Sequence, residues 1–140
     1  MSLPAEFPRA SHMNHSTHAR KHKRDAIHAA VVEVFERFGF SVIDTSAVGV
    51  IIPGYPDLQV GLSGVDNMIE IKSGEKAPYT PAQVAFHEGW RGAPIVCLTS
   101  VQAAVEWCTR TRHERRQVSE RKALEAIKDG RCVHRHGGNT

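Results

Sequence analysis

Glu70 and Lys72 have the side chains and the spacing best suited to chemistry in this sequence. They stand two residues apart in an apolar stretch, residues 65–73, that reads as a β-strand. In a strand, alternate side chains point to opposite faces of the sheet, so Glu70 and Lys72 share one face while Ile69 and Ile71 share the other. We therefore expect a carboxylate and an ammonium group side by side, with the two isoleucines in the core.

A third candidate, Asp57, lies thirteen residues before Glu70, at the start of another strand-like stretch. A short connection at Ser63-Gly64 would fold the two stretches into a hairpin and bring Asp57 beside Glu70. Two neighbouring carboxylates rarely both stay ionised unless a cation shares the space, and oxygen ligands of this kind favour Mg²⁺ or Mn²⁺. A hard cation and a lysine can neutralise phosphoryl oxygens and orient an attacking water, as phosphodiester hydrolysis requires.

A purely structural interpretation of the same residues also exists. Glu70 and Lys72 could form a salt bridge on an exposed strand, and Asp57 could be a turn residue after Pro56. A Glu-x-Lys pattern by itself is common, so the elements and motifs around it decide between the two interpretations.

The elements that would position these residues form a mixed α/β (α+β) pattern. Apolar spacing predicts a helix over residues 25–38, ended by Gly39. Thr80 as N-cap, Pro81 at the first helical position and Gln83 as capping-box partner predict a helix over about residues 80–91. Strands are predicted at residues 41–48, 57–62, 65–73 and 94–99, a loop at 49–56, and two more helices at 101–112 and 119–128. Helices covering a mixed sheet are expected.

Composition and charge fit one folded domain that binds a polyanion. The length of 140 residues suits a single domain. Residues 25–109 hold four Lys/Arg and ten Asp/Glu, whereas the flanks hold the other 14 Lys/Arg and five Asp/Glu. Basic flanks attract nucleic acid around an acidic centre, although solvated ends would look the same.

No apolar run approaches the roughly 20 residues that cross a bilayer and no signal peptide is evident, so we expect a cytoplasmic protein without membrane contact. The cysteines are odd in number and irregularly spaced, which indicates reduced thiols, with Cys97 in the core.

Several motifs in order resemble a known family. They are Gly54-Tyr55-Pro56-Asp57-Leu58, then Glu70-Ile71-Lys72-Ser73-Gly74, then Thr80-Pro81-Ala82-Gln83, followed by His87 and Trp90-Arg91-Gly92. Over residues 25–107 the chain resembles the VRR-NUC branch of the PD-(D/E)xK nucleases, which are similar to Holliday-junction resolvases, and above all its small stand-alone phage and bacterial members. The resemblance implies a restriction-endonuclease-like αβββαβ core, to which this chain would add a C-terminal helix.

The resemblance also implies roles for the site residues. Asp57 and Glu70 would hold the metal together with the Ile71 carbonyl, Lys72 would position or activate the nucleophilic water, and Gln83 would lie beside the site. Family members carry an acidic residue on the first helix, for which Asp25 is the best match, with Glu33 and Glu36 as further candidates. The loop over residues 49–55 is longer than the family usually shows.

Two residues keep a structural alternative. The capping box alone accounts for Gln83. His87, one helical turn after Gln83, could face the site or simply pack against a neighbour. Sets of His and Cys in the N-terminal arm (His12, His15, His18, His22) and in the tail (Cys132, His134, His136) lack a second pair at ligand spacing, which argues against structural zinc.

These observations predict three segments and one activity. Residues 1–24 form a flexible basic arm, in part vector-derived because Ser11-His12-Met13 resembles a cloning scar. Residues 25–112 form the nuclease domain, and residues 113–140 a basic helix and tail. The predicted activity is a Mg²⁺- or Mn²⁺-dependent DNA endonuclease, with selective cutting of branched or flapped DNA as a further hypothesis. The resemblance also implies products that end in a 5′-phosphate and a homodimer that acts on both strands of a duplex. The rivals are an exonuclease or nickase, an RNA-directed nuclease, and a non-catalytic DNA-binding module.

Overall fold

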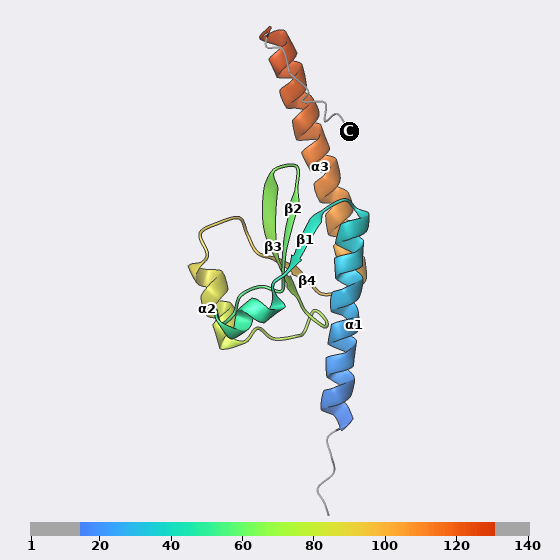
Figure 1. The fold of residues 1–140 in the computed structure, drawn as a ribbon, viewed down its shortest axis with the longest axis vertical. Helices are drawn as coiled ribbons and strands as arrows, with labels where there is room; N and C mark the ends of the chain where they lie inside the picture. Colours follow the sequence, from blue (N-terminus) through green and yellow to red (C-terminus); the bar gives the residue numbers. More distant parts are fainter. Residues whose placement is uncertain (1–14, 131–140) are drawn as a thin grey trace, which may run out of the picture.

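The computed structural model describes residues 15–130, with side-chain surroundings from Arg24 onward. The elements follow in the order α1 (His15–Arg37), β1 (Ser41–Asp44), the 3₁₀ helix η1 (Ser46–Val50), β2 (Leu58–Leu62), β3 (Val65–Ile71), α2 (Pro81–Gly89), β4 (Val96–Leu98) and α3 (Val101–Lys128) (Figure 1). This order confirms the expected mixed α+β class and the αβββαβ core.

One four-stranded sheet carries the site, in the order β1-β2-β3-β4. The first three strands are antiparallel, and β4 joins β3 in parallel. Ser63 and Gly64, with φ angles of 55° and 75°, form the two-residue turn between β2 and β3. Positive φ at both central positions is what a tight hairpin turn of the I′ type requires. The predicted hairpin is therefore confirmed, with Leu58 opposite Ile69.

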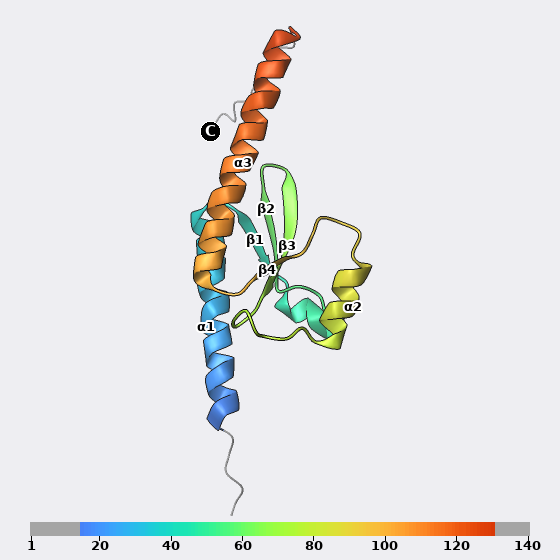
Figure 2. The same cartoon turned by 180° about the vertical axis from the view of Figure 1, so that it is seen from behind.

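Helices α1 and α3 lie together on one side of the sheet, and α2 with η1 lies on the other (Figures 1 and 2). The core fills the space between the sheet and this helix pair. Its buried side chains are Val31 and Phe35 of α1, Phe40, Leu58, Val60, Ile69, Ile71 and Leu98 in and before the strands, and Ala104 and Cys108 of α3. The helix pair therefore buries the face that carries Ile69 and Ile71, which leaves Glu70 and Lys72 on the other face.

The ends of α1 differ in how well they were predicted. At its C-terminus, Gly39 has a φ of 84°, its N–H bonds to the Glu36 carbonyl at 3.0 Å, and the N–H of Phe40 bonds to the Phe35 carbonyl at 3.0 Å. This paired pattern is the usual glycine-ended helix cap, as predicted. The N-terminus lies at His15, ten residues before the predicted start, so residues 15–24 belong to α1 instead of an irregular arm. The segment lacks Gly and Pro and is rich in Lys and Arg, which favour helix even without an apolar stripe.

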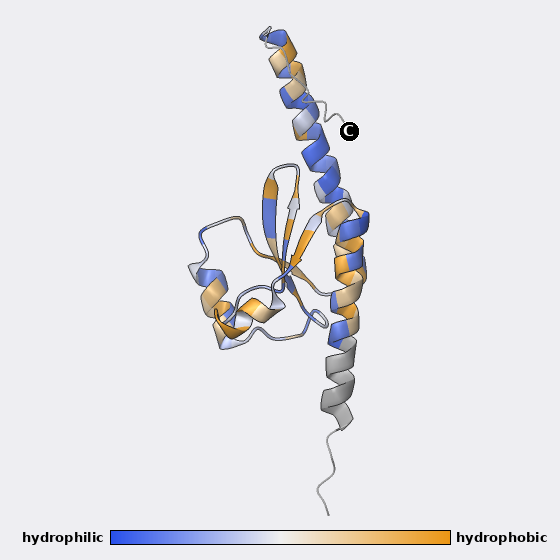
Figure 3. Ribbon diagram, viewed as in Figure 1, coloured by the Kyte–Doolittle hydropathy of each residue, from blue (hydrophilic) through white to orange (hydrophobic). Residues whose placement is uncertain are grey.

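The two C-terminal helices expected from the sequence are one continuous helix, α3. Residues 113–118 contain no Gly or Pro, and Arg116 bonds to Glu120 one turn later at 2.9 Å, so nothing interrupts the helix. Its distal half projects beyond the sheet and is largely hydrophilic (Figure 3). Arg115 joins α3 to the hairpin, because it donates to the Leu62 carbonyl at 2.9 Å and to Asn67 Oδ1 at 2.5 Å.

Two smaller predictions were wrong. Residues 46–50, expected to continue the first strand into a loop, form η1, because the Val48 N–H turns back to the Thr45 carbonyl at 2.9 Å. Cys97, expected in the core, is exposed. It is the register partner of Glu70, so it belongs to the opposite face from the buried Leu98.

No helix among residues 15–130 is both long enough and apolar enough to span a membrane.

Candidate active site

The hairpin brings the two predicted carboxylates together. Continuing the β2–β3 register by one pair beyond Leu58 and Ile69 sets Asp57 opposite Glu70. Asp57 Oδ2 accepts a hydrogen bond from the Ile71 N–H at 2.8 Å, and the Asp57 carbonyl accepts one from the Thr45 N–H at 2.8 Å. The first bond locks the Asp57 side chain onto the strand that carries Glu70.

Glu70 is a buried carboxylate with one oxygen unsatisfied. Its side chain is 2% exposed, and Oε1 accepts a hydrogen bond from Gln83 Nε2 at 2.6 Å. Oε2 is fully buried and has no hydrogen-bond partner among the described residues. Burial, and then the nearby negative charge of Asp57, raises the pKa of Glu70 to about 7, against the opposing charge of Lys72. The site therefore favours a proton or a cation at this carboxylate.

Lys72 is held beside Glu70 on the same face of the strand, as predicted. The residue is 8% exposed, and its Nζ donates to Gln83 Oε1 at 2.6 Å and to the Pro78 carbonyl at 3.2 Å. The distance from Nζ to Glu70 Oε1 is 3.7 Å. An exposed surface salt bridge does not describe this pair, because both groups are buried.

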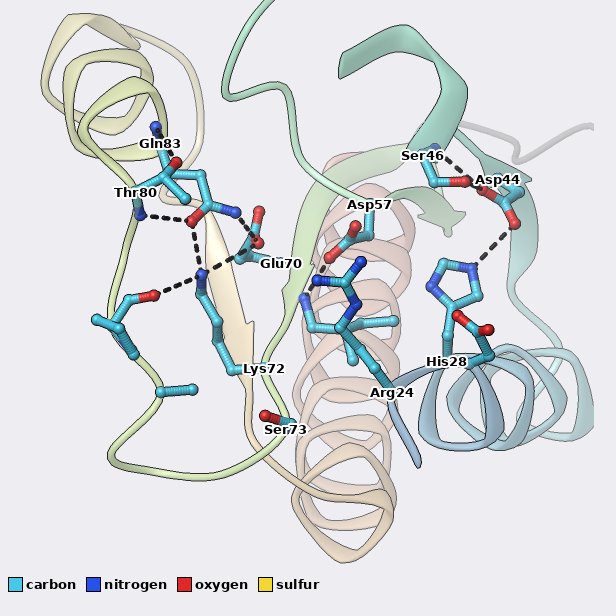
Figure 4. Close-up of a pocket in the computed structure, with 14 residues that line it drawn as sticks. Arg24, His28, Asp44, Ser46, Asp57, Glu70, Lys72, Ser73, Thr80 and Gln83 are labelled. Carbon is cyan, nitrogen blue, oxygen red and sulfur yellow. Dashed lines mark hydrogen bonds and ion pairs between the residues drawn. The ribbon is translucent and has the colours of Figure 1, made fainter. Parts of the chain in front are cut away.

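Gln83 links Glu70, Lys72 and the start of α2. Its Oε1 also accepts the Thr80 N–H at 3.0 Å, while the Thr80 side chain accepts the Gln83 N–H at 3.2 Å, so the predicted capping box is present. The capping and site interpretations of Gln83 are therefore compatible, since a single amide makes both sets of bonds (Figure 4).

These side chains line one pocket of about 560 Å³ between α1, the sheet and the start of α2. It is lined by Arg24, Asp25, His28, Asp44, Ser46, Asp57, Glu70, Ile71, Lys72, Ser73, Ala77, Pro78, Thr80 and Gln83. Of the three acids considered on the first helix, Asp25 reaches the pocket. Glu33 and Glu36 do not line it; Glu33 instead bonds to Arg37 at 2.6 Å on the exposed face of α1.

The donor set suits a hard divalent cation. Glu70, with its unpartnered Oε2, lines the same pocket as Asp57 and Ile71. Such oxygen donors match Mg²⁺ or Mn²⁺. Within residues 24–130, no three or more His, Cys, Asp and Glu side chains gather closely enough to hold a metal by themselves. Any cation here would therefore depend on two carboxylates, backbone oxygen and water.

Sequence reasoning missed a second polar group on the far wall of the pocket. His28 Nε2 and Asp44 Oδ2 are 2.9 Å apart, and Asp44 Oδ1 accepts from both the N–H (3.0 Å) and Oγ (2.6 Å) of Ser46 (Figure 4). The Ser46 hydroxyl bond is the main cause that lowers the pKa of Asp44. An Asp followed two residues later by Ser, at a strand end, is the local signal that could have shown this turn.

His87, the other residue left open by the sequence, does not line the pocket. Its ring packs against Tyr79, with centroids 5.1 Å apart. The histidine and cysteine sets weighed for zinc concern side chains outside the described residues, as does the proposed cloning scar.

Comparison with known proteins gives one informative match. No protein-family model matches the chain, and no curated protein matches it. A solved structure described as "VRR_NUC domain" matches with 31% sequence identity and a TM-score of 0.53. The alignment covers 60% of this chain and 91% of that one, so nearly the whole of that domain has a counterpart here.

Proposed function

Because the chain belongs to the VRR-NUC family of nucleases, we propose that it is a Mg²⁺- or Mn²⁺-dependent endonuclease that hydrolyses DNA phosphodiester bonds. One observation carries the proposal: Glu70, opposite Asp57 in the strand register and beside Lys72, is a buried carboxylate with one oxygen unpartnered among the described residues. A buried carboxylate with one oxygen unsatisfied is costly, so a protein that needed only a stable core would gain by replacing it.

Asp57 and Glu70, with the Ile71 carbonyl and water, would hold the cation. Asp25, expected from the sequence as a further ligand, lines the same pocket but does not form a three-carboxylate group with them, so it is left out of this set. When bound, the cation would supply positive charge to the phosphoryl oxygens and lower the pKa of a water molecule.

The chain's own residues then have defined tasks. The Lys72 ammonium, fixed by Gln83 and the Pro78 carbonyl, donates a hydrogen bond to the attacking water or to a phosphoryl oxygen. The oxygen of that water forms a bond to phosphorus as the bond from phosphorus to the 3′ oxygen breaks. The water's proton passes to solvent, and the leaving 3′ oxygen takes one up. Products with a 5′-phosphate and a 3′-hydroxyl follow.

Affinity for DNA would depend on basic residues in and beyond the pocket. Arg24 lines the pocket, and the 23 residues before it together with α3 carry 11 of the 18 Lys and Arg residues. Contacts of this kind bind phosphates without reading sequence, and they weaken as salt is added. We propose that they provide affinity while the pocket provides cleavage.

Two finer features belong to the proposal. Selectivity for branched or flapped DNA would follow if a phosphate reaches the pocket more easily where the duplex opens. A homodimer would present two pockets to the two strands of one duplex. An exonuclease or nickase with the same site remains the main rival, followed by a nuclease acting on RNA and a non-catalytic DNA-binding module.

Cleavage assays on defined substrates test this assignment. The protein would be incubated with closed circular plasmid, linear duplex, a four-way junction and single-stranded RNA, in Mg²⁺, Mn²⁺ or EDTA. Cleavage of the plasmid in Mg²⁺ or Mn²⁺ but not in EDTA supports the endonuclease. Cutting of the linear duplex alone would favour the exonuclease, cutting of RNA alone the RNA-directed enzyme, and binding without cleavage the module.

Matched variants separate the site from the fold. Glu70→Ala removes the buried carboxylate, whereas Glu88→Ala removes an exposed one on α2. The proposal requires loss of cleavage in the first variant and wild-type cleavage in the second. Full activity of Glu70→Ala would refute it.

A further inference from the structure

One helix face supports Lys72 at two points. Gln83 and His87 are four residues apart in α2 and therefore project from the same face. Gln83 contacts Lys72 directly, whereas His87 contacts Tyr79, whose ring lies over the Lys72 ammonium. Building on the proposed nuclease activity, we propose that Tyr79 and His87 are positioning residues: the Tyr79 ring keeps the Lys72 ammonium beside Glu70, and His87 keeps the ring in place.

The geometry around the ammonium supports this role for Tyr79. Lys72 Nζ lies 4.5 Å from the centroid of the Tyr79 ring, well inside the range of a cation–π contact. Its hydrogen-bond acceptors, Gln83 Oε1 and the Pro78 carbonyl, come from α2 and from the segment before it. A lysine side chain has a long flexible stem, and its two hydrogen bonds and the longer ion pair with Glu70 leave the ammonium room to move. The Tyr79 ring adds a contact with the ammonium that is spread over the face of the ring.

Partial burial makes the contact stronger than a surface one. Lys72 is 8% exposed and Tyr79 38% exposed, so the ring separates the ammonium from solvent on its own side. Cation–π contacts strengthen as the cation loses water. The ring thus favours the position of the ammonium that the proposed chemistry requires, without adding a proton donor or acceptor to the pocket.

His87 packs directly against the Tyr79 ring. The two rings meet edge to face, with centroids 5.1 Å apart and planes at 70°. His87 Nε2 is buried without a hydrogen-bond partner among the described residues, which costs stability unless packing offsets it. Burial first, and the Lys72 charge second, lower the pKa of His87, so the ring packs as a neutral group. His87 does not line the pocket, so its proposed effect on Lys72 passes through its contact with Tyr79.

Substitutions that separate ring character from bulk test the inference. Tyr79→Phe keeps the aromatic face, and Tyr79→Leu keeps an apolar side chain without it. With a metal-loaded enzyme and a plasmid or junction substrate, Tyr79→Phe should keep kcat within about twofold. Tyr79→Leu should lower kcat by about tenfold, and KM should stay within about twofold in both. Trp90→Leu, which alters another exposed aromatic at the end of α2, serves as control and should leave kcat within about twofold.

A double-mutant cycle tests the link to His87. His87→Ala should lower kcat about threefold, and Tyr79→Leu/His87→Ala should be no slower than Tyr79→Leu, because His87 acts only through the ring. Additive losses would overturn the role of His87. Wild-type kcat in Tyr79→Leu, or an equal loss in Tyr79→Phe, would overturn the role of Tyr79.

A metal-free NMR measurement keeps this inference separate from the proposed activity. The Lys72 ε-methylene protons should be shifted upfield by the Tyr79 ring in the wild type and in Tyr79→Phe, and should lose that shift in Tyr79→Leu. An unshifted wild-type signal would refute the contact even if the enzyme cuts DNA. Failure of the wild type to cleave any nucleic acid would refute the nuclease assignment, and the placement of Lys72 would then be judged by this shift alone.

Discussion

Replacing Glu70 by glutamine should stabilise the metal-free protein at neutral and higher pH. The folded protein holds the pKa of Glu70 at about 7, whereas an unperturbed glutamate has the ordinary value of 4.5. The folded state therefore binds this proton more tightly than the unfolded state. The stability that this carboxyl contributes is fully present below pH 4.5, declines between pH 4.5 and 7, and is lost above pH 7. The neutral amide of the variant would resemble the protonated carboxyl at every pH.

The size of the effect follows from the same difference. Each pKa unit corresponds to about 1.4 kcal/mol, so ionising Glu70 in the folded state costs at most about 3 kcal/mol by pH 8. That amount raises the melting temperature of a domain of this size by roughly 10 °C. The variant can retain the contact with Gln83 Nε2, because the carbonyl oxygen of the new amide would still accept that hydrogen bond.

Unfolding experiments in EDTA measure this directly. Thermal or urea unfolding, followed by circular dichroism at pH 5, 6, 7 and 8, gives the free energy of unfolding of wild type and Glu70→Gln. The two should be close at pH 5 and should separate by up to about 3 kcal/mol at pH 8. Excess Mn²⁺ should then raise the melting temperature of the wild type and leave Glu70→Gln almost unchanged.

The control and the refuting outcome are equally concrete. Glu88→Gln changes an exposed carboxylate and should follow the wild type at every pH. If the free energies of unfolding of Glu70→Gln and the wild type instead change in parallel from pH 5 to pH 8, burial and Asp57 do not raise the pKa of Glu70 as described. A wild type that is no less stable in EDTA than in Mn²⁺ would remove the case for a cation at this carboxylate.

Further predictions concern the other contacts. Asp57→Ala should abolish cleavage, at least about 1000-fold in kcat, and leave DNA affinity within about threefold in a fluorescence anisotropy titration; full activity would contradict the assignment of the site. Gln83→Ala should lower the free energy of unfolding by about 1–3 kcal/mol and kcat at least about tenfold, because it leaves buried groups of Lys72 and Glu70 unpaired; an unchanged melting temperature and kcat would mean that the amide is dispensable. Binding of Mn²⁺, measured by calorimetry, should weaken about tenfold for each pH unit below about 7, since a proton competes for Glu70; affinity that is flat from pH 5 to 8 would exclude this competition. Arg115→Met should destabilise the protein by about 1–3 kcal/mol without changing kcat, because Arg115 joins α3 to the far end of the hairpin; a loss of kcat with full stability would contradict this purely structural role.

The parts of the site that depend on local sequence could be predicted, and the parts that depend on packing could not. Asp57, Glu70 and Lys72 follow from one hairpin, whose turn and alternation are visible in the residues themselves. The capping box at Thr80 is a four-residue motif and was equally visible. By contrast, His28 and Asp44 are sixteen residues apart on a helix and a strand, and only the packing of α1 against β1 joins them.

The errors in the elements have the same physical origin. Cys97 stands in an apolar run, but its face of the sheet is decided by the parallel register with β3, which sequence periodicity over three residues cannot reveal. The joining of the last two predicted helices reflects the absence of any breaker, whereas their apolar pattern alone suggested an interruption. The role of Tyr79 was not visible at all, because it depends on where the segment before α2 crosses Lys72.

The Ile71 N–H, at the end of β3, donates a hydrogen bond to Asp57, the residue just before β2. Asp57 and Glu70 are therefore held by the same pair of strands and should move together. Thermal motion of α1 would widen or narrow the entrance without altering the separation of the two acids. The separation of the two acids is thus set by backbone pairing within the sheet and does not depend on the position of α1.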